Sequence, residues 1–304
     1  MPTREISLVS LQERASASAW VGWLPLACVP FGALVIRNVL PPWLFMWTLA
    51  IALYASLKWV SWWRSPLRSR ATKGRSIGYL IAWPGMDSES FLDDSLCVAP
   101  PAVRDWVWVC SKTALGAVLL WAVARRVPAD APLVRGWIGL VGCVLLAHFG
   151  SFHIVALMWQ AVGVAAVPIM ASPIASPSLS EFWGRRWNLG FRQLAHDFIF
   201  RPLHRALGVG GASFLVFVIS GVVHDFVISL PARGGYGLPS AYFVLQSIGV
   251  SIERSRFGKR TGLRQGIRGW LFMAAFTAGP AFWLFHPPFV RNVVLPFMHV
   301  IHAI

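Results

Sequence analysis

A histidine and an aspartate stand side by side in an otherwise apolar run. His224 and Asp225 interrupt GVVHDFVISL, Gly221–Leu230, which otherwise reads as a membrane-buried helix. Burying such groups costs several kcal/mol, and ionisable residues inside membrane helices commonly mark functional sites. An imidazole accepts a proton near neutral pH, so His224 is a candidate general base. Ser220, four residues earlier, shares its helical face and provides a small, polar-tolerant surface.

Structural interpretations of this pair remain open. His224 can be a histidine that only hydrogen-bonds a neighbouring helix. Asp225 faces a different side of the helix, because adjacent helical residues do not face each other, so it can serve a separate structural contact. Pro231 is expected to end the helix. At about 1.5 Å per residue, His224 then lies about 10 Å from the helix end and inside the membrane.

A basic, aromatic-rich segment precedes the histidine run. It reads SEFWGRRWNLGFRQLAHDFIFRPLHRALG and covers Ser180–Gly208. Its amphipathic pattern is typical of a helix at the membrane surface whose arginines reach toward water. Arg185, Arg186 and Arg192 are also suited to binding phosphates. Ser180 is a candidate cap for the start of a helix.

The composition indicates a membrane protein. Of the 304 residues, 56% are hydrophobic and only 13% are charged, whereas soluble domains carry about 25% charged residues. The 17 tryptophans fit a chain with many residues at the membrane interface. The net charge of +15 arises mainly in loops between apolar segments, where cytoplasmic loops collect basic residues. We therefore expect a lipid bilayer, and no nucleic acid, among the partners.

The apolar segments predict an all-α, polytopic integral membrane protein with about seven to nine transmembrane helices. A spanning helix needs about 20 apolar residues. The clear candidates are Trp20–Leu40, Trp43–Trp63, Trp106–Ala124, Ala212–Leu230, Leu238–Ile252 and Gly269–Phe285. Phe289–Ile304 is borderline in length, and Ile77–Met86 is too short to cross, so it is expected to re-enter the membrane or lie in its interface. Trp137–Met170 is expected to form two tight helices that meet near Phe149–His153.

The basic segments predict the topology. There are three of them: Lys58–Arg75, Arg185–Arg205 and Arg254–Arg268. The positive-inside rule places all three on the cytoplasmic side, and the N-terminus and C-terminus fall there too if every late span is real. The Ser/Pro segment Ser172–Ser178 is expected to stop the preceding helix. It divides a single domain into N-terminal helices, residues 19–171, and a second half, residues 180–304.

The order of these motifs resembles a known family. SEFWGRRWN and HDFIFRPL, followed about 35 residues after Asn188 by the intramembrane SGVVHD, resemble the membrane-bound O-acyltransferase superfamily. The chain is most similar to the wax synthase branch, the long-chain-alcohol O-fatty-acyltransferases. YLIAWPGMDSESFL, Tyr79–Leu92, adds to the likeness. The specific part of the resemblance covers Phe182–Leu230.

The resemblance implies a helical membrane enzyme with an intramembrane tunnel, in which an acyl chain moves from a thioester to a hydroxyl group. It implies that His224 is the intramembrane histidine and that Asn188 is the polar residue ending the FWxxWN-type motif, which argues against a two-histidine site. His224 is then the expected general base on the alcohol. Asn188 is expected to orient a substrate or stabilise the developing oxyanion. We expect one acyltransferase domain over residues 1–304, no metal, and no cofactor besides acyl-CoA as co-substrate.

The resemblance also suggests the substrate contacts. The predicted substrate-binding residues are Arg185, Arg186, Arg192, Trp187, Ser220 and Asp225, and the three arginines are assigned to the CoA phosphates. The expected acceptor is a long-chain alcohol, and a sterol, terpenoid, glycerolipid or sugar hydroxyl is the alternative. A second alternative is a transporter with a His-Asp proton relay, which would predict internal repeats. A bacterial plasma membrane and the endoplasmic reticulum both remain open, as does the oligomeric state.

Overall fold

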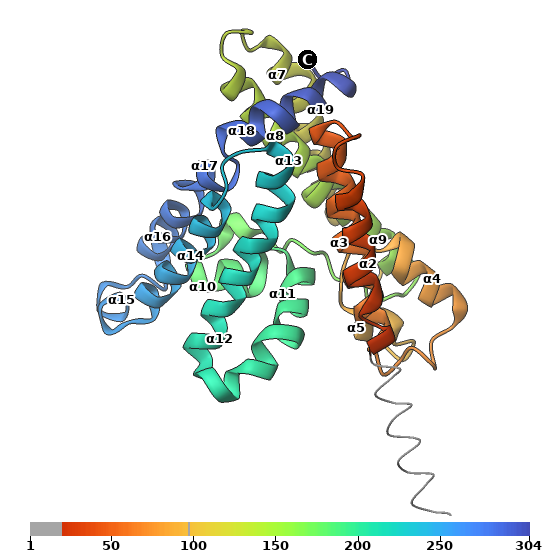
Figure 1. Cartoon of the computed structure of the whole chain (residues 1–304). Coiled ribbons are helices and arrows are strands. Elements are labelled where there is room, and N and C mark those ends of the chain that lie inside the picture. The colour runs from red at the N-terminus through yellow and green to blue at the C-terminus, as the bar shows by residue number, and fades with distance from the viewer. Residues whose placement is uncertain (1–19, 97) are drawn as a thin grey trace, which may run out of the picture.

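The computed structural model describes residues 20–304 with the exception of residue 97, so residues 1–19 lie outside the described part. Every regular element in that part is helical (Figure 1). Four of its helices are long and apolar enough to cross a membrane: Pro42–Trp63, Val103–Arg126, Pro132–Ala161 and Leu189–Ala232. The expected all-α integral membrane fold is confirmed. The count of seven to nine spans and the tunnel stay predictions.

Two helices near the start of the described chain pack side by side (Figure 1). α2 covers Leu24–Val35, and α3 covers Pro42–Trp63. α3 begins at a proline because the first helical turn needs no backbone donor there. The pair shares a core in which Ala33 of α2 meets Phe45 and Leu49 of α3. α2 has 12 residues, so it is shorter than the predicted span over Trp20–Leu40.

Two short helices follow on the side of the molecule that carries the first basic segment. α4 covers Lys73–Ala82 and α5 covers Ser88–Leu92. The Thr72 hydroxyl caps α4, and the Asp87 carboxylate caps α5 by accepting from the Ser90 N–H at 3.0 Å. With ten residues, α4 is too short to cross a membrane, as the sequence predicted for this region. Residues 83–87 between the two helices are extended or irregular.

The long apolar segment after residue 130 differs from the prediction. Residues 103–126 form α6 (Val103–Ala117), η1 (Val118–Val123) and α7 (Ala124–Arg126) as one helix, and residues 132–161 form α8 (Pro132–Val144), η2 (Leu145–Ser151) and α9 (Phe152–Ala161) as another. The expectation of two tight helices is therefore wrong. The predicted junction near Phe149 is a π-helical widening, which keeps the chain helical. The helix ends at Ala161, ten residues before the Ser/Pro segment expected to stop it.

The segment Ser180–Gly208, called the motif segment below, is not a single surface helix. Together with the His224 helix that follows, it forms α10 (Leu179–Glu181), η4 (Phe182–Arg186), α11 (Leu189–Ala195), η5 (His196–Phe200), α12 (Arg201–His224), η6 (Asp225–Ser229) and α13 (Leu230–Ala232). Gly208 has φ 68° and ψ 173°, which glycine adopts readily, and it turns the chain between the α11 arm and the rest of α12 (Figure 1). Ser178, and not Ser180, caps α10 by accepting from the Glu181 N–H at 3.1 Å. The helix ends one residue after Pro231, close to the predicted position.

The remaining elements complete the bundle. They are α14 (Leu238–Arg254), α15 (Arg256–Thr261), α16 (Gly266–Ala278), α17 (Ala281–Leu284), α18 (Pro287–Phe289), η7 (Val290–Val294) and α19 (Leu295–Val300). The last elements lie beside the end of α6–α7, where the Trp121 indole N–H donates to the Ile301 carbonyl at 3.1 Å. Figure 1 places the C-terminus at the end opposite α15 and the Gly208 bend. The C-terminus was expected on the side of the basic segments if every late span is real, and it does not lie there.

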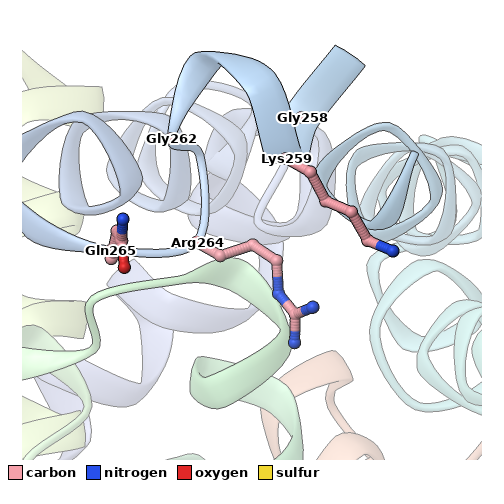
Figure 2. A pocket seen from close by; sticks show the side chains of 5 residues that line it. All are labelled: Gly258, Lys259, Gly262, Arg264 and Gln265. Atoms are coloured by element: carbon pink, nitrogen blue, oxygen red, sulfur yellow. The ribbon is translucent and has the colours of Figure 1, made fainter. Parts of the chain in front are cut away.

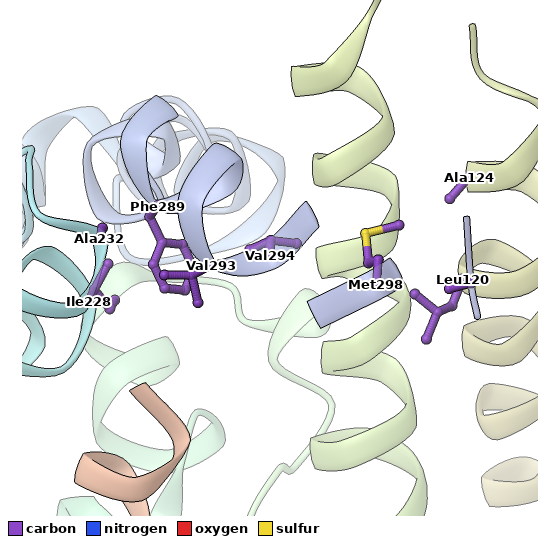
Figure 3. Close-up of a cluster of buried hydrophobic side chains, with 9 residues drawn as sticks. Leu120, Ala124, Ile228, Ala232, Phe289, Val293, Val294 and Met298 are labelled. Carbon is purple, nitrogen blue, oxygen red and sulfur yellow. The ribbon is translucent and has the colours of Figure 1, made fainter. Parts of the chain in front are cut away.

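A buried apolar cluster joins three parts of the chain at that end (Figure 3). Its members are Leu120, Ala124, Ile228, Ala232, Phe289, Val293, Val294, Met298 and Ala303. They come from α6–α7, from the end of the His224 helix and from the C-terminal elements. Gly136 and Gly139 of α8 leave the room that Val290 and Met298 occupy. The cluster therefore fixes the end of the His224 helix.

A glycine pair sets the crossing of the apolar helices over residues 103–126 and 132–161. A Cβ on Gly142 would lie 2.9 Å from the Gly116 carbonyl oxygen, and a Cβ on Gly116 would lie 2.9 Å from the Gly142 carbonyl oxygen. Small residues allow such close approach of membrane helices. We expect Gly142→Ala to lower the thermal unfolding midpoint in detergent, because overpacking costs about 1–3 kcal/mol.

The matched control is Gly32→Ala in α2, where a Cβ meets nothing within 4 Å. Alanine there should keep or raise the midpoint, because it favours helices over glycine by about 1 kcal/mol. An equal rise in both variants would contradict the tight crossing.

Candidate active site

His224 is the last residue of α12 before the π-helical stretch. Its Nδ1 lies 2.7 Å from the Ser220 carbonyl oxygen. A carbonyl only accepts hydrogen bonds, so Nδ1 carries the proton and Nε2 keeps its lone pair. No described residue hydrogen-bonds Nε2, which makes this nitrogen available as a base. Ser220 shares the face of His224 as predicted, but its hydroxyl donates to the Val216 carbonyl at 2.8 Å.

Phe243 of α14 connects His224 to the motif segment. The His224 and Phe243 ring centroids are 4.5 Å apart, and Phe243 lies 5.6 Å from the Trp183 ring. Trp183 contacts Phe182 at 5.1 Å, and Phe182 stacks on Trp187 at 5.3 Å with an interplanar angle of 15°. These contacts fix the orientation of the motif segment relative to the histidine. Trp187 therefore lies in an aromatic packing chain, and its predicted substrate contact stays a prediction.

Asn188 forms the turn between η4 and α11. Its backbone has φ 43° and ψ 60°, a left-handed conformation that asparagine tolerates better than most residues. Its Oδ1 caps α11 by accepting from the Phe191 N–H at 3.5 Å. Its backbone N–H donates to the Met170 sulfur at 3.3 Å. The side-chain amide nitrogen has no partner among the described residues, so it can donate to a bound group.

The bend at Gly208 folds the chain back on itself between Asn188 and His224. About 19 helical residues separate Asn188 from the bend, and about 16 separate the bend from His224. At about 1.5 Å per residue these arms measure about 28 and 24 Å. The first arm follows α11 and the second follows α12 back toward the far end (Figure 1). The two arms are thus similar in length, and a shared reaction zone for Asn188 and His224 stays a prediction.

The loop at residues 83–88 contacts the start of α11. A Cβ on Gly190 would lie 3.2 Å from the Met86 backbone nitrogen. Lys58 of α3 supports this loop, because its ammonium donates to the Gly85 carbonyl and lies 3.3 Å from the Tyr79 ring centroid. The Tyr79 hydroxyl donates to the Met86 carbonyl at 3.0 Å, and burial raises the pKa of this phenol. The Tyr79–Leu92 motif therefore forms one side of the Asn188 turn.

Lys58 does not belong to the basic loop in which its sequence position suggested it lies. It was grouped with a basic loop, yet it lies inside α3 and only 1% of its surface is exposed. Its position inside the predicted Trp43–Trp63 span was the signal that could have separated it from the loop, because charges within spans are rare.

The three predicted phosphate-binding arginines have different surroundings. Arg186 pairs with the Glu181 carboxylate, with its Nη2 at 2.6 Å and its Nε at 2.7 Å from Oε1. Its Nη1 also donates to the Ala171 carbonyl at 3.4 Å. Arg185 and Arg192 are exposed, and no described residue pairs with either side chain. Two of the three guanidinium groups are therefore free to meet an anion.

Asp225 anchors the beginning of α14. Its Oδ1 accepts from the Gly237 N–H at 2.8 Å and from the Ser229 hydroxyl at 2.9 Å. Its Oδ2 accepts from the Ser240 N–H at 3.0 Å and from the Ser240 hydroxyl. Four donors explain why a carboxylate is tolerated beside His224. The separate structural contact considered for Asp225 is present, and its substrate-binding role stays a prediction.

A buried histidine that the sequence analysis did not select completes this network. The His286 Nδ1 accepts from the Phe289 N–H at 3.2 Å, so its Nε2 carries the proton and donates to the Ser229 hydroxyl at 3.1 Å. Ser229 in turn donates to Asp225. Burial lowers the pKa of His286, and the nearby Asp225 charge opposes that shift. A serine nucleophile would instead donate to the histidine, so this arrangement holds structure.

Comparisons with known proteins agree with the resemblance stated above. The model of the membrane-bound O-acyl transferase family matches residues 166–245, which contain both Asn188 and His224. The chain is 31% identical over 151 residues to "Probable long-chain-alcohol O-fatty-acyltransferase 7" of Arabidopsis thaliana, covering 45% of this chain and 44% of that protein. The likeness to membrane-bound O-acyltransferases is thus confirmed over this part of the chain.

Two further relatives are similar to this chain over a comparable length. "Long-chain-alcohol O-fatty-acyltransferase" of Simmondsia chinensis is 29% identical over 146 residues, or 44% of this chain and 41% of the relative. "Acyl-CoA--sterol O-acyltransferase 1" of Arabidopsis thaliana is 29% identical over 140 residues, or 42% of this chain and 40% of the relative. The chain spans less than half the length of the curated relatives it matches. These names support the wax synthase branch that the motifs indicated.

The Asp225 network yields a stability prediction. We expect Asp225→Ala to lower the thermal unfolding midpoint strongly, because it leaves partly buried donors of the α14 start unpaired at about 1–3 kcal/mol each. Asp130→Ala is the control, because Asp130 is an exposed carboxylate in a loop. Differential scanning fluorimetry in detergent measures both. Equal midpoints for the two variants would show that the network contributes no stability.

Proposed function

We propose that this chain transfers a fatty acyl group from acyl-CoA to the hydroxyl group of a long-chain alcohol, which gives a wax ester and free CoA. The observation that carries the proposal is the free Nε2 of His224, held by Ser220 and Phe243 within the segment that matches the acyltransferase family. A base held in an apolar, membrane-embedded helix suits an alcohol substrate that itself partitions into the membrane.

The proposed reaction assigns each proton to a named atom. His224 Nε2 takes the proton from the alcohol hydroxyl as the alcohol oxygen attacks the thioester carbonyl carbon. The Asn188 amide N–H donates to the carbonyl oxygen as negative charge develops there. The carbon–sulfur bond then breaks, and His224 returns its proton to the CoA sulfur. The sum is an ester and a thiol, with His224 regenerated.

The apolar surroundings serve selectivity as well as binding. The Phe243 ring of α14 contacts His224, and aromatic rings of the motif segment pack against Phe243. Such an environment excludes water, which would otherwise compete with the alcohol for the thioester. It also strengthens the hydrogen bond that Asn188 offers to the oxyanion.

The acceptor follows from the relatives. Most of those compared are named for long-chain alcohols, which makes a long-chain alcohol the first choice. One relative is named for sterols, so a sterol is the second candidate. Either acceptor would react through the same base with the same bonds made and broken. The two differ only in the shape of the apolar part of the acceptor molecule.

The first test is product analysis with the full chain in detergent, labelled palmitoyl-CoA and a panel of long-chain alcohols and sterols. Mass spectrometry should detect a long-chain ester, and His224→Ala should lower its rate by at least about a hundredfold, because general-base catalysis contributes about 10²–10⁴. His299→Ala, which removes an exposed histidine near the C-terminus, is the control.

A folded His224→Ala variant that retains most of the rate would remove the base from the mechanism. A sterol ester in place of the wax ester would keep the mechanism and change the acceptor. No ester from any acceptor would overturn the proposed function.

The proposed contacts between the arginines and the acyl-CoA phosphates are tested by substituting each arginine, because Arg186 is paired and Arg185 and Arg192 are not. We expect Arg185→Gln and Arg192→Gln each to raise the KM for acyl-CoA by about three- to tenfold with little change in kcat, because each loses an exposed charge–phosphate contact. Arg186→Gln should lower stability more than affinity, because Glu181 already neutralises that side chain. Initial-rate measurements at two salt concentrations separate the effects. An unchanged KM in both single variants would exclude these residues from donor binding.

A further inference from the structure

The turn between α15 and α16 carries five cationic side chains, and four of them have no acidic partner among the described residues. The turn, defined here as residues 256–268, contains Arg256, Lys259, Arg260, Arg264 and Arg268. Arg264 lies 3.9 Å from the buried Glu253 carboxylate. The other four side chains have no partner among the described residues and are exposed. None of these four side chains bonds a residue of the segment Ser180–Gly208, to which the proposed reaction is assigned.

Two adjoining hollows open at this turn. One, of about 380 Å³, is lined by Gly258, Lys259, Gly262, Arg264 and Gln265. Figure 2 shows the Lys259 and Arg264 side chains extending in the same direction from the turn. Gly262 has φ 75°, which lets the chain reverse tightly after α15. The turn therefore presents its charges on a compact, fixed backbone.

The second hollow is amphiphilic. It is a shallow, widely open depression and not an enclosed cavity, and it is lined by Arg260, Thr261, Leu263, Arg268, Leu271 and Phe272. Arg268, Leu271 and Phe272 share one face of α16 because they are three and four residues apart. Leu271 is 55% exposed, and Phe272 is held against Phe276 at a centroid distance of 4.5 Å. The lining therefore combines two arginines with exposed and partly buried apolar side chains.

Helix stability does not explain Arg268. It lies in the first turn of α16, where the partial positive charge of the helix start disfavours a cation, and that turn contains no acidic residue. The preference of cytoplasmic loops for basic residues accounts for the number of charges. It does not account for a pair of arginines at the rim of an apolar hollow.

We propose that the hollow lined by Arg260, Arg268, Leu271 and Phe272 binds an anionic phospholipid. The two guanidinium groups hold the headgroup phosphate, because planar N–H donors match phosphate oxygens. One acyl chain lies along Leu271 and Phe272. This site is additional to the proposed active site, and its occupant is a membrane lipid that is not consumed.

The position of the hollow favours a membrane lipid over the phosphates of the acyl donor. Ile267 and Leu271 of α16 are 67% and 55% exposed, as expected of a helix face that meets lipid. His224 packs instead on α14 through Phe243. A ligand that reaches the hollow from the bilayer therefore does not need to enter the region of the proposed reaction.

Residues on both sides of the turn contact the start of the motif segment and the loop before it. The Trp270 indole N–H donates to the Ile174 carbonyl at 2.7 Å, and the Arg254 guanidinium donates to the Ser180 hydroxyl at 3.2 Å. The Glu253 carboxylate accepts from the Ser180 N–H at 3.1 Å. A lipid that stiffens the turn would thereby stiffen the attachment of the motif segment.

The test measures lipid binding without turnover, so it is independent of the proposed function. Native mass spectrometry of the full chain in detergent compares retention of phosphatidylglycerol and phosphatidylcholine. We expect preferential retention of phosphatidylglycerol, reduced at least about fivefold in the double variant Arg260→Gln/Arg268→Gln. Arg70→Gln/Lys73→Gln is the matched control, because it removes the same charge from exposed residues of another basic segment.

Leu271→Asn tests the apolar half and should also reduce retention. Each variant is first checked by size-exclusion chromatography for a single folded species. Equal losses in the two double variants would overturn the site in favour of general charge attraction. Displacement of phosphatidylglycerol by free CoA in the unsubstituted protein would overturn the lipid assignment and give the phosphates of the donor as the occupant.

Discussion

The close contact between α12 and α14 is the constraint on which the candidate site depends. A Cβ on Gly221 would lie 2.8 Å from the Ser240 Cα, so only glycine allows the two helices to approach this closely. The Asp225 carboxylate then binds the backbone and the hydroxyl of Ser240. Because His224 lies between these two contacts, they fix its rotation about the helix axis. Phe243, one turn further along α14, receives the imidazole ring.

The contact between α12 and α14 gives different roles to His224 and Asp225, which are adjacent in the sequence. Asp225 is used to join helices, and His224 is left with one nitrogen bonded to its own helix and one nitrogen free. The π-helical stretch that begins at Asp225 changes the direction of the following side chains, so Ser229 reaches both Asp225 and His286. The buried network thus supports the histidine without competing for its free nitrogen.

Local spacing explains what could be predicted from the sequence. His224, Ser220 and the C-terminal end of their helix follow from helical periodicity and from Pro231, and Asn188 follows from the motif that carries the family resemblance. The partners that support them come from far along the chain: His286 lies 57 residues from Ser229, and Gly85 lies 27 residues from Lys58. No periodicity within one segment encodes such pairs. The Gly208 bend was also missed, because a glycine within an apolar pattern predicts a turn only when its φ is known.

The position of Arg185 limits how a donor can reach the site. Arg185 precedes Asn188 by three residues, so the two Cα atoms are at most about 11 Å apart. If Asn188 and His224 act at a similar depth, Arg185 lies near that depth as well. An unpaired guanidinium there requires water or an anion, because an isolated charge in the bilayer core costs several kcal/mol. Arg185 is exposed and Arg186 is already neutralised by Glu181. The region beside Asn188 must therefore be reached from the polar side, and a donor that brings its own phosphates satisfies the charge that the protein leaves open.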